Sequence, residues 1–187
     1  VRSIIVDPDQ VEKLKKLKEK YPGCTTRLGI TDGYPFGGLT TRSKVRQALF
    51  AVEQGLDEID VGININALMS GDWDAVREDL KTVVDAVDGR LNIAPVSWLV
   101  RLSLAQIDQL CELYIDLGIT TLKTSAGLHF GNMKVEHVDY VHKHYGDKLD
   151  IEVAGRCRTR ETAEVMREAG ASYFHMSQWR RICGGEF

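Results

Sequence analysis

The sequence predicts an α/β fold with a parallel sheet, a TIM (β/α)8 barrel that lacks its first βα unit in this chain. Short β-branched and apolar runs alternate with longer amphipathic segments over the whole chain, one strand and one helix to each repeat. Polar residues stand at the C-terminal ends of these runs, namely Asp7, Asp32, Asp60, Lys123, Glu152 and Ser177. In a barrel those ends meet at one mouth, whereas an open sheet would spread them along an edge. The barrel is therefore favoured.

The elements follow in order along the chain. The predicted strands are Ser3–Val6, Arg27–Thr31, Glu58–Ile63, Leu91–Val96, Thr121–Ser125, Asp150–Ala154 and Tyr173–Ser177. The predicted helices are Asp9–Lys20, Arg42–Gln54, Trp73–Val87, Leu104–Leu117, Val135–Tyr145 and Arg160–Ala169. Ser103 and Thr159 are expected as N-caps, because their hydroxyls can accept from free backbone N–H groups. Gly55, Gly118 and Gly170 each follow a last helical turn, where a left-handed residue is wanted.

Seven strands are visible where eight close the usual barrel, so we expect one βα unit to be missing ahead of Val1. Residues 1–187 are predicted to form a single barrel domain. A barrel open at one strand leaves unpaired edges, which residues upstream of Val1 or a partner subunit would cover. We expect a homo-oligomer.

The composition is that of an ordinary globular protein. Of 187 residues, 43% are hydrophobic and 27% are charged, and the formal net charge of -3 gives no electrostatic reason to expect nucleic acid or a membrane surface. The four cysteines are scattered, so neither a zinc site nor a disulfide framework is indicated. The histidines at 137, 142 and 144 lack metal-ligand spacing, and no metal is expected. These features predict a cytoplasmic protein.

Lys123 is the residue with the clearest chemical potential. It lies in the apolar run Thr121–Ser125, and burial lowers the pKa of an amine by penalising its charged form. A neutral amine can form a Schiff base with an aldehyde or ketone. The alternative is a lysine whose ammonium reaches the mouth and pairs with a carboxylate.

Asp60 is the first candidate partner for this lysine. Strand alternation in Glu58–Ile63 turns Asp60 toward the barrel axis if Ile59 and Val61 face the helices. An inward carboxylate near a lysine can relay protons to a carbinolamine, or it can serve only as a charge partner.

The sequence resembles the deoxyribose-phosphate aldolase family over nearly its whole length. The segments that carry the resemblance include Tyr34–Gly37, Glu58–Asp60, the Lys-Thr-Ser-x-Gly run Lys123–Gly127, and Ala154–Thr159. The resemblance implies a barrel lyase of carbohydrate metabolism, a class I aldolase that works without metal or organic cofactor. It implies Lys123 as the Schiff-base lysine and Asp60 as the proton-relaying carboxylate. The family cleaves 2-deoxyribose 5-phosphate reversibly to acetaldehyde and glyceraldehyde 3-phosphate.

Glu152 departs from the family pattern, which has a second lysine on this strand. A neighbouring ammonium lowers the pKa of a Schiff-base lysine, whereas a carboxylate stabilises its ammonium form. A shift of two pKa units would cost about 2.7 kcal/mol in available neutral amine. Two interpretations stay open. Glu152 is a general acid/base with Asp60 second, or Lys123, Asp60 and Glu152 form an inert ion-paired cluster.

The predicted phosphate site also departs from the family, which offers a Gly-Gly pair and a Gly-x-Ser-Ser run. This chain has Gly155-Arg156 and His175-Met176-Ser177-Gln178 at those places. Gly127, Gly155, Arg156 and Ser177 are the candidates to hold an anionic group, Arg156 as a bidentate clamp or simply as a surface residue.

Two functions follow from these residues. The first is a class I aldolase-like lyase that makes or breaks a C–C bond in a small phosphorylated or anionic aldehyde or sugar. The second is a catalytically degenerate aldolase-fold protein that binds a metabolite or a partner.

Overall fold

The protein is described by a computed structural model, which covers residues 1–127, 133–155 and 157–184. The chain divides into two compact units, Val1–Pro95 and Val96–Phe187. The boundary falls near the end of one strand, β4 (Asn92–Val96). The prediction of a single barrel domain stays a prediction.

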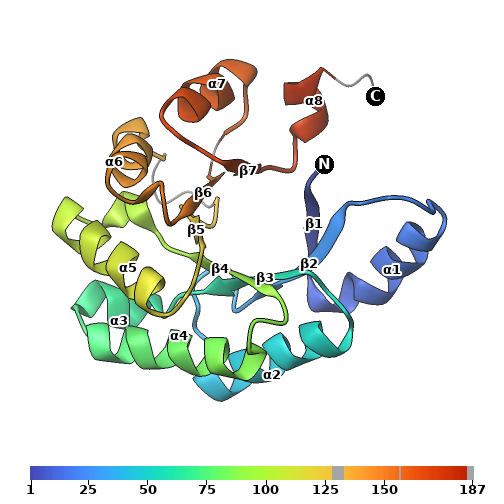
Figure 1. The fold of residues 1–187 in the computed structure, drawn as a ribbon, viewed down its shortest axis with the longest axis horizontal. Coiled ribbons are helices and arrows are strands. Elements are labelled where there is room, and N and C mark those ends of the chain that lie inside the picture. Colours follow the sequence, from blue (N-terminus) through green and yellow to red (C-terminus); the bar gives the residue numbers. More distant parts are fainter. Residues whose placement is uncertain (128–132, 156, 185–187) are drawn as a thin grey trace. The chain divides into compact units, whose positions relative to one another are not determined.

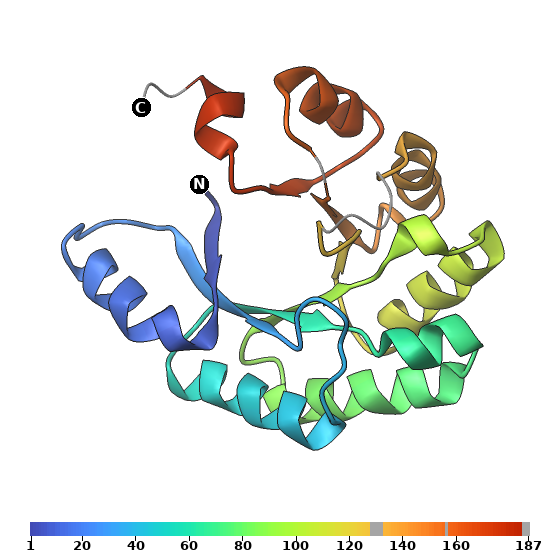
Figure 2. The same ribbon diagram turned by 180° about the vertical axis from the view of Figure 1, so that it is seen from behind.

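The first unit is a parallel sheet with helices packed on it (Figure 1). Its strands are β1 (Ser3–Val6), β2 (Arg27–Asp32), β3 (Glu58–Gly62) and the start of β4, paired in that order. Its helices are η1 (Pro8–Gln10), α1 (Val11–Glu19), α2 (Thr41–Glu53), α3 (Ile65–Ser70) and α4 (Trp73–Val87). Helices α2 and α4 lie side by side in both views of the ribbon (Figures 1 and 2).

The second unit repeats the plan from the end of β4. Its further strands are β5 (Thr121–Lys123), β6 (Asp150–Ala154) and β7 (Tyr173–His175), again parallel and paired in chain order. Its helices are η2 (Leu99–Arg101), α5 (Leu104–Asp116), α6 (Val135–Tyr145), α7 (Arg160–Glu168) and α8 (Trp179–Cys183). No helix in the described part of the chain combines the length and the apolar character that crossing a bilayer requires.

The predicted helix boundaries are confirmed by the capping contacts. Ser103 caps α5 in a capping box, in which its hydroxyl and the Gln106 side chain satisfy each other's backbone N–H groups. The Thr159 hydroxyl accepts from the Thr162 N–H at the start of α7. Gly55, Gly118 and Gly170 all have positive φ, as expected for residues that end a helix.

Each unit has its own apolar interior. In the first, Ile30 and Ile59 of the sheet and Leu80 of α4 are completely buried, and in the second Leu122 and Ile151 are buried beneath the helices. Tyr114 of α5 is also completely buried, and its hydroxyl is satisfied by Ser97 Oγ at 2.9 Å. Parallel strands covered in this way hold their C-terminal ends in fixed positions, and the chemistry-bearing residues lie there.

Candidate active site

The second unit brings three ionisable side chains together at the ends of its strands. Lys123 on β5 pairs in register with Glu152 on β6. Glu152 in turn pairs with Tyr173 on β7, so His175, two residues farther along, has its side chain on the same face. The sheet register therefore places Lys123, Glu152 and His175 on one face of three neighbouring strands.

The three side chains are in direct contact. Lys123 Nζ lies 2.8 Å from His175 Nδ1 and 3.2 Å from Glu152 Oε1. His175 Nδ1 lies 3.3 Å from the same Glu152 oxygen. The side chains of Lys123 and Glu152 are 3% and 6% exposed, whereas that of His175 is 38% exposed. The amine is thus buried, and its imidazole neighbour reaches solvent.

Glu152 is an ionised carboxylate in this cluster. Burial by itself would raise its pKa, but the hydrogen bond with His175 and the charge of Lys123 outweigh burial and hold the pKa at about 2. A carboxylate with so low a pKa is a weak base at neutral pH. It therefore places a negative charge beside Lys123 and His175, and its role as a general acid/base stays a prediction.

The turns after β5 and β6 meet beside this cluster. Ser125 Oγ accepts from the Gly127 N–H at 3.0 Å. Gly155 has φ +100°, and a Cβ placed on it would lie 2.5 Å from the same Ser125 Oγ. Only glycine fits there, because both the backbone conformation and the close approach exclude a side chain. The two predicted glycines, Gly127 and Gly155, are thus brought together at one place.

Three other residues were predicted for the site. Ser177 is exposed in the turn between β7 and α8. Asp60 is buried on β3 of the first unit, 1% exposed, and its meeting with Lys123 stays a prediction. Arg156 lies outside the described residues.

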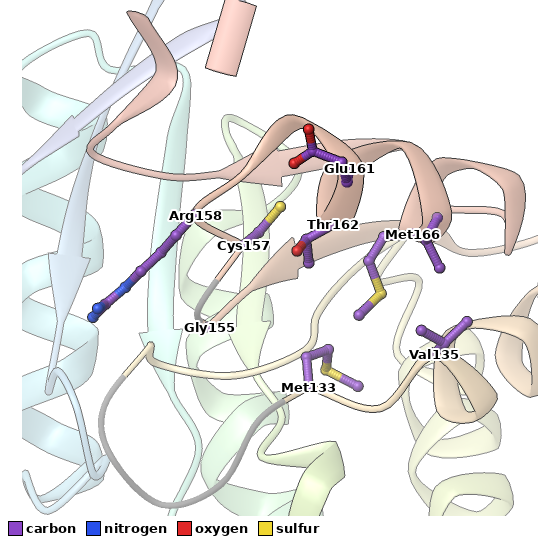
Figure 3. Close-up of a pocket in the computed structure, with 9 residues that line it drawn as sticks. Met133, Val135, Gly155, Cys157, Arg158, Glu161, Thr162 and Met166 are labelled. Atoms are coloured by element: carbon purple, nitrogen blue, oxygen red, sulfur yellow. The ribbon is translucent and has the colours of Figure 1, made fainter. Parts of the chain in front are cut away.

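A cavity of about 660 Å³ opens beside Gly155, between the loop after β6, the start of α6 and α7. Its wall contains the sulfur-bearing side chains of Met133, Cys157 and Met166, and the Arg158 side chain extends away from them (Figure 3). Glu161 lies at the α7 end of this wall. Its own backbone N–H and the Thr159 hydroxyl lower the pKa of the Glu161 carboxyl. The N-terminus of α7 therefore already holds a carboxylate.

Comparisons with known proteins indicate the family of this chain. No family model matches the chain. The deoxyribose-phosphate aldolase of Clostridium novyi is 36% identical over 156 residues, which are 83% of this chain and 70% of that protein. The chain belongs to the deoxyribose-phosphate aldolase family. The family's enzyme from Caldicellulosiruptor saccharolyticus is 35% identical over 91% of this chain and 77% of its own length. The one from Thermococcus gammatolerans is 34% identical over 98% of this chain and 81% of its own length.

Solved structures of aldolases have the same fold. A structure titled "QR15, an Aldolase" superposes with a TM-score of 0.87 and 26% identity, over 98% of this chain and 80% of that one. The deoxyribose phosphate aldolase of Aeropyrum pernix, whose title describes a tetramer, gives a TM-score of 0.85 at 19% identity over 96% and 75% of the two chains. The predicted family is confirmed, and the fold is the TIM-barrel-like fold of these aldolases.

His175 is the site residue that the sequence analysis missed. In the run from His175 to Gln178 the comparison with the family's phosphate loop singles out Ser177 and not His175. The signal was nevertheless present, because alternation along Tyr173–His175 puts the histidine on the same face as Tyr173. Tyr173 pairs with Glu152, and Glu152 pairs with Lys123, so the histidine and the lysine lie on the same face of the sheet.

Proposed function

We propose that this chain is a class I aldolase in which Lys123 forms a Schiff base with a small aldehyde or sugar phosphate. The observation that carries the proposal is the buried Lys123 amine, held 2.8 Å from an imidazole nitrogen and 3.2 Å from a carboxylate at the ends of three parallel strands. Membership in a family of aldehyde lyases supports this function over that of a non-catalytic binding protein. The family reaction gives the substrate class.

His175 can accept the proton that Lys123 must lose before its amine attacks a carbonyl. Transfer from Nζ to Nδ1 leaves a neutral amine beside an imidazolium. Glu152 Oε1 lies 3.2 Å from Nζ and 3.3 Å from Nδ1, so its attraction for the proton differs by only about 3% between the two positions. The carboxylate that stabilises the ammonium therefore stabilises the imidazolium nearly as well. Glu152 in place of the family lysine is compatible with imine formation for this reason.

The reaction then proceeds as a balanced sequence. The neutral Lys123 amine adds to the substrate carbonyl, and the carbinolamine loses water as the imidazolium returns its proton to the leaving hydroxyl. The protonated imine accepts the electron pair of the breaking C–C bond while the substrate's β-hydroxyl gives its proton to the neutral His175 imidazole, which releases one aldehyde and leaves an enamine. Protonation of the enamine carbon and hydrolysis of the imine regenerate the amine. In this proposal Glu152 supplies a constant negative charge, His175 transfers protons, and Asp60 is the second proton relay.

The anionic end of the substrate is assigned to the loops after β5, β6 and β7. We propose Gly127, Gly155 and Ser177 as backbone and hydroxyl donors, with Arg156 as a charge partner. The contact between the Gly127 and Gly155 turns supports this assignment, because neither has a side chain to block the approach of a ligand. The α7 N-terminus is not assigned to the substrate, since the Glu161 carboxylate is already there.

Reductive trapping tests the proposal directly. With acetaldehyde and borohydride, the imine is reduced to a secondary amine, which leaves an ethyl group on Nζ of the reacting lysine. We expect peptide mass mapping to find this group on Lys123, and Lys123→Ala to remove both the adduct and the turnover. Lys143, a 65% exposed lysine paired with Asp139, serves as the control, since Lys143→Ala removes an ordinary amine. An ethyl group found on Lys143 but not on Lys123 would overturn the proposal in favour of the degenerate binding protein.

Three further expectations concern the scaffold, the oligomeric state and the cellular location of the protein. We propose the TIM barrel of the family as its scaffold, supported by the structural match over 98% of the chain. That the first βα unit is missing stays a prediction.

We also propose a homo-oligomer, for which the tetramer of the Aeropyrum pernix enzyme is the support, and light scattering on the purified chain tests it. The cysteines at 24, 111, 157 and 183 are free, which fits the proposed cytoplasmic location.

A further inference from the structure

A second cavity, of about 430 Å³, opens in the first unit at the C-terminal ends of β1 and β2. None of the residues assigned to the aldolase reaction lines it. Its wall consists of Asp7 and Pro8 after β1, Thr31 and Asp32 at the end of β2, residues of the following loop including Tyr34 and Phe36, and Gln47 of α2. The volume lies in the range of small-molecule sites.

Asp32 is the unusual member of this wall. It is 1% exposed, and neither carboxylate oxygen has a hydrogen-bond partner among the described residues. Burial, as the largest cause, and the charge of Asp79 raise its pKa to about 7, although Lys44 acts in the opposite direction. Lys44 makes no hydrogen bond to this carboxyl group, and its Nζ donates instead to Asp79 Oδ2 at 2.6 Å and to the Gly62 carbonyl at 2.8 Å. Burying a carboxyl group without a hydrogen-bond partner destabilises the folded protein, and a bound ligand with a hydrogen-bond donor would remove this penalty.

The loop that forms the outer wall is held in place by its backbone. The Gly37 N–H donates to the Gly33 carbonyl at 2.7 Å, and Gly37 has φ +62°. A Cβ on Gly37 would lie 1.9 Å from the Ile63 carbonyl oxygen, so the loop rests directly on the chain that follows β3. The backbone of this wall is therefore preformed, which lowers the cost of ordering it around a ligand.

The charge and aromatic content of the wall define the ligand. Asp7 and Asp32 are acidic, and the wall contains no lysine, arginine or histidine among the residues that the structure describes. An anion such as phosphate would find no positive charge there. Tyr34 and Phe36 are 46% and 42% exposed, and aromatic faces attract cations and stack on flat apolar groups. Carboxyl groups without a positively charged side chain, next to aromatic rings, match an organic cation.

We propose that this cavity binds a small organic ammonium ion, whose charged end pairs with Asp32 and whose apolar body lies against Tyr34 and Phe36. Both Asp32 oxygens are covered, so the ligand reaches them when an exposed side chain of the wall turns aside. Asp7, held by a hydrogen bond from Thr31 Oγ1 at 3.1 Å, adds a second negative charge at the wall.

Three probes that share one ring and differ in charge test the proposal: benzylammonium, benzyl alcohol and benzoate. Their dissociation constants are measured by NMR titration of the purified chain. We expect benzylammonium to bind at least tenfold more tightly than benzyl alcohol, and benzoate to bind most weakly. Affinity for benzylammonium should fall as the pH decreases through about 7, because the Asp32 carboxyl takes up a proton and loses its charge. Equal affinities for the three probes would overturn the proposal.

Three variants locate the binding. Asp32→Asn should remove most of the preference for benzylammonium, whereas Asp9→Asn, which changes the same charge on an exposed residue outside the cavity, should preserve it. Tyr34→Ala alters an exposed side chain and should weaken both benzylammonium and benzyl alcohol. An unchanged preference in a folded Asp32→Asn variant, or an equal loss in Asp9→Asn, would show that the ammonium binds elsewhere.

Discussion

At the scale of single residues, the candidate active site depends on where one proton resides. Lys123 Nζ and His175 Nδ1 are 2.8 Å apart, a distance at which a proton can pass directly between the two nitrogens. Glu152 is nearly equidistant from both and does not favour either position. Because His175 is partly exposed, it can also exchange its proton with solvent.

His175→Gln tests this arrangement. Glutamine keeps a polar side chain but cannot take up a proton at neutral pH, so we expect imine formation to slow on the order of 100-fold. The rate of borohydride-trapped adduct formation on Lys123 measures the effect. His144→Gln is the matched control, since His144 lies on α6 and contacts the Tyr140 carbonyl instead. Equal rates for wild type and His175→Gln would show that the amine loses its proton by another route.

At the scale of elements, one buried ion pair ties two helices to a strand of the first unit. Lys44 of α2 is completely buried and pairs with Asp79 of α4 at 2.6 Å. Its Nζ also donates to the Gly62 carbonyl at the end of β3. Asp79 Oδ1 accepts from Thr41 Oγ1, again from α2, at 2.7 Å. This network sets where α2 sits against α4 and β3.

Removing one partner of this pair should cost more than removing both. Lys44→Met leaves the Asp79 charge buried without its ammonium, and we expect the free energy of unfolding to fall by about 3–5 kcal/mol. In the double variant Lys44→Met/Asp79→Leu no such charge remains, so most of that loss should be recovered. Urea unfolding of both variants measures the difference. A double variant as unstable as the single one would show that the network contributes mainly through packing.

Elements and candidate residues were not equally predictable from the sequence. All seven strands and the six longer helices lie within one or two residues of their predicted positions, because their hydrophobic periods and caps are local signals. The short helices α3 and α8 were missed, since five or six residues show no period. Lys44 was missed because a lysine within an amphipathic helix usually lies on its exposed face. Its burial depends on Asp79, which is distant in sequence, just as the role of His175 depends on Lys123 and Glu152.

At the scale of the whole molecule, two buried carboxyl groups make opposite contributions to stability. The pKa of Glu152 is lowered to about 2, so Glu152 stabilises the folded state above its unfolded pKa near 4.5, and this stability is lost as the pH falls toward 2. The pKa of Asp32 is raised from 3.8 to about 7, so the unfolded state ionises first. Asp32 therefore destabilises the folded state increasingly between about pH 4 and pH 7, and fully above pH 7.

Asp32→Asn should remove this pH-dependent penalty. The pKa difference corresponds to about 4 kcal/mol, so relative to wild type the variant should gain up to that amount of stability between pH 4 and pH 8. Any cost of burying the new amide is the same at both pH values and cancels in the comparison. Urea unfolding of wild type and variant at pH 4 and pH 8 measures the gain, with Asp9→Asn as the exposed control. The same stability difference at both pH values would mean that Asp32 is already ionised and satisfied in the folded protein, and the binding site proposed around it would lose its main support.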